Sequence, residues 1–383
     1  QMNYSSLQFP SGFSFDVDTG SISYDGLGSL GQFTNTISTT NGVDNHSTSI
    51  AITIFEHNQV EGRIGSFVYD AGFSSSASST DAISINAGLE YSCLITHENR
   101  MKCWGYNNYG QVGVNHGSTV STPTYTYDTW MKSTKSMDVG TNHACSIDNE
   151  SQLWCWGYNN YGQIGIGDTA SKDDPILITA NEGSGWDVKI LQVSVGVYLT
   201  CALTSNWEVY CWGANNFNQL GVSNSILGSS QKTPMHIEGF GSSRPLMVSA
   251  GEQLACILLE NGSIGCMGYA ANGAMGDDNT TESIGIRWPQ LPAGRTAVSI
   301  DVGIYHACAI LDDFSLVCWG QNNNGQIGTG NATSENVLVP TQVLDSSYQV
   351  VGVTTGRDST CAWLYNGSAL CWGLNNYGQL GIG

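Results

Sequence analysis

The hydrophobic residues of this chain fall in short runs separated by polar turns, and few stretches favour a helix. One unit of the pattern is clear near the end of the chain. A strand is expected at 340–344 (PTQVL), an apolar strand ending in glycine follows at 350–356 (VVGVTTG), and a hairpin comes next. The 47 glycines suit many tight turns. The pattern predicts an all-β fold.

Every hairpin of this kind begins and ends on a cysteine. The second cysteine opens a phrase of the form CWGxNxxGQxG, as in CWGYNNYGQVGVN at 103–115. The 12 cysteines form six pairs, each ten residues apart: Cys93 with Cys103, Cys145 with Cys155, Cys201 with Cys211, Cys256 with Cys266, Cys308 with Cys318, and Cys361 with Cys371.

This spacing fits a disulfide within each hairpin. In the fourth pair, a three-residue loop at 260–262 with Gly262 in the left-handed conformation places Cys256 opposite Cys266. Gly367 and Asn99 take the same loop position. Each bond closes a short loop, worth about 2–3 kcal/mol on the entropic account. Zinc sites use shorter spacings, so we predict six disulfides and an oxidising, extracellular or cell-surface location.

The pairs recur at a period of 52 to 56 residues. About four short strands for each period indicate a β-propeller or a solenoid. The chain has no apolar run long enough for a transmembrane helix and no signal peptide at its start, and Gln1 is read as the start of a processed chain or a fragment.

The phrase resembles the regulator-of-chromosome-condensation repeat, whose signature includes Trp-Gly-x-Asn-x-x-Gly-Gln-Leu-Gly. The resemblance covers about 66–383 and implies a β-propeller with one blade for each repeat. The fourth unit departs, with Met267–Gly268 and YAANGAMG. Five units carry the Trp-Gly pair: Trp104–Gly105, Trp156–Gly157, Trp212–Gly213, Trp319–Gly320 and Trp372–Gly373.

The repeats place the propeller at 63–383. Six units are counted, with GSFVYD at 65–70 as the first outer strand; family members usually have seven blades. Residues 1–62 lack the repeat. There, FPSGFSFDVDTGSISYDG (9–26) resembles immunoglobulin-like, cadherin-like repeats of prokaryotic surface proteins, with a closing strand at 47–57. Such a domain needs more strands, so either the chain was cut from a longer one or the missing strands come from another subunit by strand exchange.

The charge of the chain excludes some partners. Lys and Arg number 12 against 32 Asp and Glu, a formal charge of −20. Nucleic-acid binding relies on clustered basic residues, and anionic membrane surfaces repel such a chain, so neither partner is expected.

Candidate chemistry is sparse. His143 and His306 share one repeat position, but Leu199 stands there in another unit, so we interpret both as packing or blade-to-blade hydrogen-bonding residues. Asp16, Asp18 and Asp25 are weak candidates for calcium and fit a turn better. No other cofactor and no catalytic set is expected. The acidic runs at 172–174 and 276–278 are interpreted as solvated loops.

Two surface features remain. The repeated Asn-Asn phrases, such as YNNYG, give a ring of asparagine and aromatic side chains that either binds a glycan or protein or only forms turns; turns are favoured. Seven sequons are candidates for glycosylation: Asn3, Asn45, Asn149, Asn261, Asn279, Asn331 and Asn366.

Three functions follow from these observations. The preferred hypothesis is a non-enzymatic extracellular structural or adhesive protein, a subunit of a surface polymer assembled through its N-terminal strands. The alternative is a secreted propeller that binds a protein or glycan. An enzyme with its site in the central channel has no positive support.

Overall fold

The computed structural model describes residues 82–114, 119–126, 133–179, 188–281, 284–330 and 335–381, and the backbone of four N-terminal strands. Two compact units divide the chain, one of residues 1–61 and 71–77, the other of residues 62–70 and 78–383. In the first, β1 (Phe13–Phe15) pairs with β2 (Ile22–Tyr24) and β3 (Gly31–Thr40) with β4 (Asn45–Ile54).

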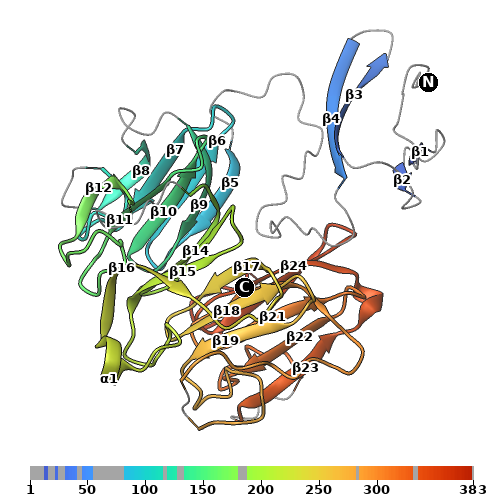
Figure 1. Ribbon diagram of the computed structural model, residues 1–383. Coiled ribbons are helices and arrows are strands. Elements are labelled where there is room, and N and C mark those ends of the chain that lie inside the picture. Colours follow the sequence, from blue (N-terminus) through green and yellow to red (C-terminus); the bar gives the residue numbers. More distant parts are fainter. Residues whose placement is uncertain are drawn as a thin grey trace. The chain divides into compact units, whose positions relative to one another are not determined.

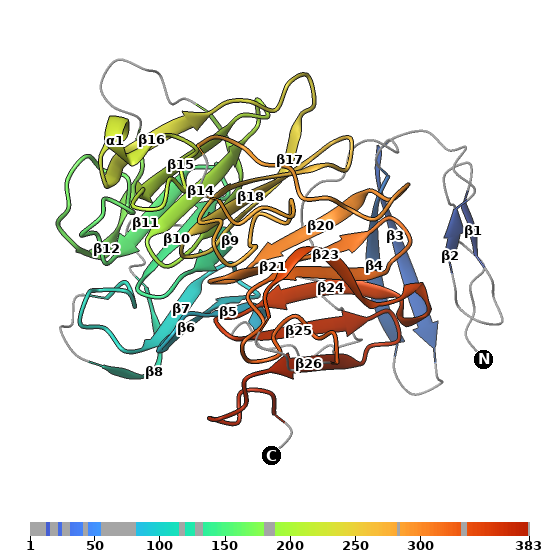
Figure 2. The ribbon, with the colours of Figure 1, turned by 90° about the horizontal axis from the view of Figure 1, so that it is seen from below.

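The second unit contains six antiparallel sheets around a channel, which confirms the predicted all-β propeller (Figure 1, Figure 2). Blade 1 consists of β5 (Ala82–Ala87), β6 (Tyr91–Thr96), β7 (Met101–Gly105) and β8 (Val120–Tyr125). Blade 2 consists of β9 (Thr134–Val139), β10 (His143–Asp148), β11 (Leu153–Gly157) and β12 (Lys172–Leu177). Blade 3 consists of β13 (Ile190–Val195), β14 (Leu199–Thr204), β15 (Val209–Ala214) and β16 (Ser230–Ile237). Blade 4 consists of β17 (Pro245–Ala250), β18 (Leu254–Leu259) and β19 (Ile264–Gly268). Blade 5 consists of β20 (Ala297–Val302), β21 (His306–Leu311), β22 (Leu316–Gly320) and β23 (Val337–Leu344). Blade 6 consists of β24 (Val350–Thr355), β25 (Ser359–Leu364) and β26 (Ala369–Gly373).

Among the described residues, helix is confined to two short turns, α1 (Asn224–Leu227) and the 3₁₀ turn Ser346–Tyr348. In the described part of the chain, no helix has the length and hydropathy needed to cross a membrane.

The outer strand of a blade follows its cysteine hairpin, so the expected order, with this strand first, is wrong. Strand β23 contains the expected strand 340–344 and pairs with β22 of blade 5, Leu344 opposite Leu316. The chain leaves the hairpin, makes the GQxG turn and returns along the outer edge of the same sheet. In consequence, the described part of blade 6 has three strands. The segment expected as the first outer strand, 65–70, lies outside the described residues.

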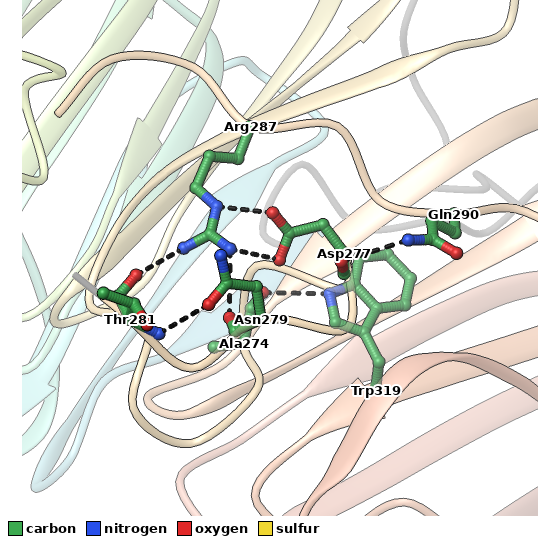
Figure 3. Close-up of polar contacts among 7 residues, drawn as sticks. All are labelled: Ala274, Asp277, Asn279, Thr281, Arg287, Gln290 and Trp319. Atoms are coloured by element: carbon green, nitrogen blue, oxygen red, sulfur yellow. Dashed lines mark hydrogen bonds and ion pairs between the residues drawn. The ribbon is translucent and has the colours of Figure 1, made fainter. Parts of the chain in front are cut away.

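Blade 4 has a side-chain network where blades 1, 2, 3 and 5 have a fourth strand (Figure 3). Cys266 and Arg287 form an isolated β-bridge. The Arg287 guanidinium donates to both carboxylate oxygens of Asp277, at 2.6 Å for Nη2, and to the carbonyls of Asn279 and Thr281. The expectation that 276–278 is a solvated run is therefore wrong for Asp277. The run at 172–174 also differs, since it lies in β12.

Each cysteine pair forms a disulfide in the structure, between directly opposed residues of one hairpin whose Cα atoms are 4.1 Å apart. The pairing is the one that the ten-residue spacing predicts, and no described cysteine is free. The six bonds join Cys93 to Cys103, Cys145 to Cys155, Cys201 to Cys211, Cys256 to Cys266, Cys308 to Cys318, and Cys361 to Cys371.

The loop at the tip of each hairpin keeps one residue in the left-handed conformation. Asn99, Gly262 and Gly367 occupy this position as expected. The other three units place Ser151, Trp207 and Phe314 there, with φ of 64°, 63° and 64°. The tight loop thus forms in every unit, whether or not glycine is present.

The core lies between blades, in five clusters that each join the outgoing face of one blade to the incoming face of the next. In the first cluster, Ile95 and Cys93 of blade 1 pack with Val139 and Trp156 of blade 2. The other four clusters repeat this arrangement up to blades 5 and 6. Five disulfides lie in these clusters, so each covalent link supports a packed interface.

Two repeated contacts set the distance between blades. The Trp156 indole donates to the Gln111 carbonyl of the preceding blade at 3.0 Å, and Trp212, Trp319 and Trp372 make the same bond at 2.9 Å. Beside the channel, a Cβ added to Gly196 would lie 1.8 Å from the Gly251 carbonyl oxygen of the next blade. Gly88, Gly140, Gly251 and Gly303 meet the following glycine in the same way.

We expect Gly196→Ala to destabilise the protein by about 3 kcal/mol, because the methyl group forces two backbones apart. Gly356→Ala is the matched control. A Cβ at Gly356 would meet only Ser359, at 3.0 Å from its Oγ, so little change is expected. Denaturant unfolding under non-reducing conditions measures both. Equal destabilisation by the two substitutions would contradict the proposed role of the glycine contacts.

Candidate functional site

One end of the propeller is formed by two sets of loops, and we name it the turn face. The backbone N–H of Tyr106, which opens the Asn-Asn phrase of blade 1, donates to the Glu90 carbonyl in the loop after the inner strand, at 2.9 Å. Ala214 donates to Tyr198 at 2.8 Å in blade 3. The phrase and the inner loop therefore lie together at the same end of each blade.

The first asparagine of the phrase is structural in blades 1, 2, 3 and 5. Asn107 Oδ1 accepts a hydrogen bond from the backbone N–H of Val112 at 2.8 Å, and the side chain is buried. Asn159, Asn215 and Asn322 bond their own turns in the same way, and each is equally buried. These asparagines fix the turn and are unavailable to a ligand, in agreement with the favoured interpretation.

The aromatic residues form an arc over part of the turn face, whereas the sequence predicted a ring. Tyr109 contacts Tyr158 with ring centroids 4.9 Å apart, and Tyr161 contacts Tyr198 at 4.8 Å. Tyr158 and Tyr198, 6.1 Å apart, join these two pairs. Tyr106 extends the arc at one end. We name these five tyrosines of blades 1 to 3 the aromatic arc.

The arc is uneven around the turn face because the phrases differ. Phe217 and Tyr269 form a further pair, with centroids 5.2 Å apart, on blades 3 and 4. Blades 5 and 6 carry Gln321 and Leu374 at the first position of the phrase. Tyr198 was missed from the sequence, since it lies in an inner loop and belongs to no repeated phrase.

A cavity of about 270 Å³ opens among the inner loops of the turn face. Glu252 and Arg357 line it. Burial raises the pKa of Glu252, while the charge of Arg357 and a hydrogen bond from Tyr305 oppose the increase. Burial also raises the pKa of Tyr198, and the charge of Glu252 adds to it. The cavity therefore contains one acidic side chain, Glu252, and one positively charged side chain, Arg357, beside the aromatic arc.

A second cavity, of about 360 Å³, lies in the channel. A series of hydrogen bonds between inner strands, which we name the belt, separates it from the first cavity. In the belt, one polar side chain of each inner strand bonds the backbone of the next blade. Asp138 accepts from Val195 N–H at 2.7 Å, and Asp301 accepts from Thr355 N–H at 2.6 Å. Ser194 and Ser249 accept from backbone N–H groups of the next blade in the same way, whereas the Asn86 side-chain amide donates to the Met137 carbonyl.

Asp138 and Asp301 are half-buried and line the channel cavity. Burial raises the pKa of Asp138 to about 7; the Val195 N–H bond opposes this increase, and the charge of Asp301 adds to it. Burial likewise raises the pKa of Asp301. Sequence reasoning missed both residues, although a polar residue two positions before each inner-loop glycine recurs through the repeats.

The remaining candidates are structural or untested. His143 Nε2 bonds Thr200 Oγ1 and His306 Nε2 bonds Thr360 Oγ1 in the next blade, both at 2.8 Å. Burial lowers the pKa of His143 to about 3 and of His306 to about 4, so both are neutral. This confirms the blade-to-blade interpretation. Across the described residues, no group of three or more His, Cys, Asp or Glu side chains could hold a metal.

Two predictions about modification and calcium have no structural test. Asp16, Asp18 and Asp25 lie outside the described residues, as do Asn3, Asn331 and the side chain of Asn45. Four other sequon asparagines are exposed, three at hairpin tips and one in the blade 4 loop: Asn149, Asn261, Asn366 and Asn279. Glycosylation therefore stays a prediction.

Six repeated sheets around a channel define a β-propeller of the one-repeat-per-blade class. Models of the regulator of chromosome condensation (RCC1) repeat match residues 150–203, 208–258 and 315–363, and also 82–111, 135–163, 190–219, 297–326 and 350–379. These matches together cover more than half of the chain, which belongs to the RCC1 repeat family.

The relatives have low sequence identity to this chain. The chain is 26% identical to the ultraviolet-B receptor UVR8 of Arabidopsis thaliana over 302 residues, 79% of this chain and 67% of UVR8. It is 23% identical to the human E3 ubiquitin-protein ligase HERC2 over 286 residues, 73% of this chain but 6% of HERC2. Yeast RCC1 (Prp20), solved bound to Kap60, has a TM-score of 0.69 at 19% identity, covering 79% of this chain and 72% of that one.

We expect Asp138→Asn to remove a contribution to the free energy of unfolding that destabilises the folded protein as pH rises. The folded-state pKa of Asp138 lies above the unfolded value, so the folded state retains the proton longer and stability falls as pH rises from about 4 to about 7. The substitution should stabilise the protein by about 2 kcal/mol at pH 8 and hardly at pH 4. Denaturant unfolding at several pH values measures the difference. Glu150→Gln, at an exposed hairpin tip, is the control, and a pH-independent effect of Asp138→Asn would contradict the account.

Proposed function

We propose that this protein is a non-catalytic binding module that holds a protein partner on its turn face. The aromatic arc is the observation that carries the proposal. It concentrates five tyrosines on one side of one face, beside a cavity that contains Glu252 and Arg357. Tyrosines bury a large area at little entropic cost and are enriched where proteins bind one another.

The rigidity of the face supports the proposal. The buried asparagines of the turns in blades 1, 2, 3 and 5 and the disulfide of each hairpin hold the loops before a partner arrives, so little conformational freedom is lost on binding. The excess of 20 negative charges favours a partner with a neutral or basic surface. Relatives fit this role: UVR8 is named a receptor, and yeast RCC1 was solved with Kap60 bound.

We further propose that the module acts outside the cell or on its surface. The six disulfides support this location, because such bonds persist in oxidising compartments. A glycan ligand would also stack on tyrosine rings, and we keep it as an outcome of the binding experiment. The protein-partner proposal is preferred because the arc extends over three blades, a span suited to a protein surface.

We expect Tyr109→Ala with Tyr161→Ala to weaken partner binding at least about tenfold, because both rings belong to the arc. The source organism's surface proteins, and separately a glycan array, would be presented to the immobilised, oxidised protein. Saturable binding would then be measured by interferometry. Tyr365→Ala, at an exposed hairpin tip away from the turn face, is the control. Failure to find a saturable ligand, or a ligand that binds the double variant unchanged, would contradict the proposal.

A second candidate function is assembly into a surface polymer through the N-terminal strands. Strands β3 and β4 pair along ten residues each, from Gly31 opposite Ile54 to Thr40 opposite Asn45. Among the described strands, neither pairs with a third strand, so each has an edge that another chain can extend.

The polymer proposal predicts regular filaments of the full chain in negative-stain electron microscopy, without reducing agent. Deletion of residues 1–54 should abolish them, because β3 and β4 are removed. Isolated particles at concentrations well above those used for binding would argue against strand exchange and leave the binding module as the function.

A further inference from the structure

The inner loops of the turn face line the first cavity in a regular way, and we name this cavity of about 270 Å³ the channel mouth. Every blade contributes the same positions to it: the last residue of the inner strand, the inner-loop glycine and the residue that follows. Glu252 and Arg357 are the only charged residues among these lining residues. Apart from Thr141 and Thr355, the others are glycine or apolar. The channel mouth is therefore a mostly apolar hollow that contains one acid and one base.

The two charged side chains of the channel mouth are not ion-pair partners. The Arg357 Nε lies 3.4 Å from Asp358 Oδ2 in its own loop. Glu252 takes part in no ion pair with a described residue, and its half-buried carboxylate accepts a hydrogen bond from Tyr305. Burial raises the pKa of Glu252, and the charge of Arg357 opposes this increase from beyond ion-pair distance. Glu252 thus presents a negative charge that no described cation neutralises by contact.

Aromatic side chains lie on both sides of Glu252. Tyr198 and Tyr305 each follow a lining residue of the channel mouth, in the inner loops of blades 3 and 5, and both are half-buried. Burial raises the pKa of both phenols, and the charge of Glu252 adds to the increase in each. This shared influence shows that the carboxylate is close to both side chains. Because Tyr198 also belongs to the aromatic arc, the arc leads to the channel mouth.

We propose that the channel mouth binds one protruding lysine or arginine side chain of the protein partner, with Glu252 as its counter-ion. This inference rests on the proposed function and names the chemistry of the partner. The stem of the side chain packs on the apolar and glycine wall, and its charged head lies against Glu252 between Tyr198 and Tyr305. The partner surface that covers the aromatic arc positions this side chain.

The size and charge of the channel mouth favour this occupant over others. Sites for whole small molecules usually measure about 300–1,000 Å³, so this smaller cavity suits a single long side chain. An anion would meet the Glu252 carboxylate, and Arg357 is already paired with Asp358. The formal charge of −20 attracts basic surfaces to the protein at long range.

The first test uses the cationic side chain without a partner. The oxidised full chain, labelled on its tyrosines, is titrated by NMR with Nα-acetyl-lysine amide and with Nα-acetyl-arginine amide. The ring signals of Tyr198 and Tyr305 should move and saturate with a Kd of about 1–10 mM, since a lone side chain makes few contacts. Nα-acetyl-glutamine amide, which is uncharged, should leave these signals in place. The absence of a saturable response to either cationic probe overturns the inference.

Two variants assign the response to Glu252. Glu252→Gln keeps the shape of the side chain and an acceptor for Tyr305 but removes the charge, so the Kd of the cationic probes should rise at least about tenfold. Glu90→Gln is the matched control, because Glu90 is an exposed acid of the blade 1 inner loop that does not line the channel mouth. Its Kd should change less than about twofold. Equal effects of the two substitutions would show that net charge alone attracts the probe and would refute the assignment.

Arg357 provides a test of opposite sign. Arg357→Gln removes a like charge from the channel mouth, so the Kd of the cationic probes should fall by roughly two- to threefold. Weaker binding in this variant, or a saturable response to Nα-acetyl-glutamate amide, would show that the channel mouth recognises an anion or a zwitterion. Either result overturns the proposal.

The partner experiment separates this inference from the proposed function. A protein partner found with the immobilised chain is measured against Glu252→Gln and, separately, against Tyr109→Ala with Tyr161→Ala. Loss of affinity in both supports both proposals. A partner that is weakened only by the tyrosine substitutions leaves the binding module standing and refutes the inference. A Glu252-dependent response to the probes without any protein partner contradicts the proposed function and also overturns the inference, because the occupant would then be a free organic cation.

Discussion

Contact between neighbouring blades is the constraint on which the rest of this structure depends. A single three- or four-stranded sheet cannot bury both of its faces, so each blade relies on the next one for its core. The indole-to-carbonyl bond, exemplified by Trp156 and Gln111, and the close approach of glycines such as Gly196 and Gly251 fix the spacing. The disulfides lie on the outgoing face and so stiffen the surface that these contacts use.

The same constraint determines where ligands can bind. Regular spacing brings the inner loops and the Asn-Asn turns of every blade to one end, which becomes the turn face. The turn asparagines accept hydrogen bonds from the backbone of their own turns. The neighbouring aromatic positions do not make these bonds and can therefore vary. Tyrosine occupies these positions in blades 1 and 2, whereas Gln321 and Leu374 occupy the first position in blades 5 and 6. The turn face therefore differs chemically from blade to blade, although the blades repeat the same fold.

Features that repeat were predictable from the sequence, and features that depend on single substitutions were not. The cysteine spacing and the GQxG phrase appear in nearly every unit, so hairpin register and propeller class followed from them. The order of strands within a blade was predicted wrongly, because a repeat has no intrinsic beginning. Asp277 was interpreted as solvated because its partner, Arg287, is ten residues away in the one unit that departs from the repeat. Asp138 and Asp301 could be found only by comparing equivalent positions across blades.

The central claim is that blade-to-blade packing organises the molecule. Hydrogen exchange of the tryptophan indole N–H groups, followed by NMR on the oxidised chain, tests it most directly. The account predicts slow exchange for Trp156, Trp212, Trp319 and Trp372, whose indoles donate to the preceding blade, and faster exchange for Trp104, whose indole has no hydrogen bond to a described residue. Exchange of the four indoles as fast as that of Trp104 would show that these bonds do not hold neighbouring blades together and would contradict the account.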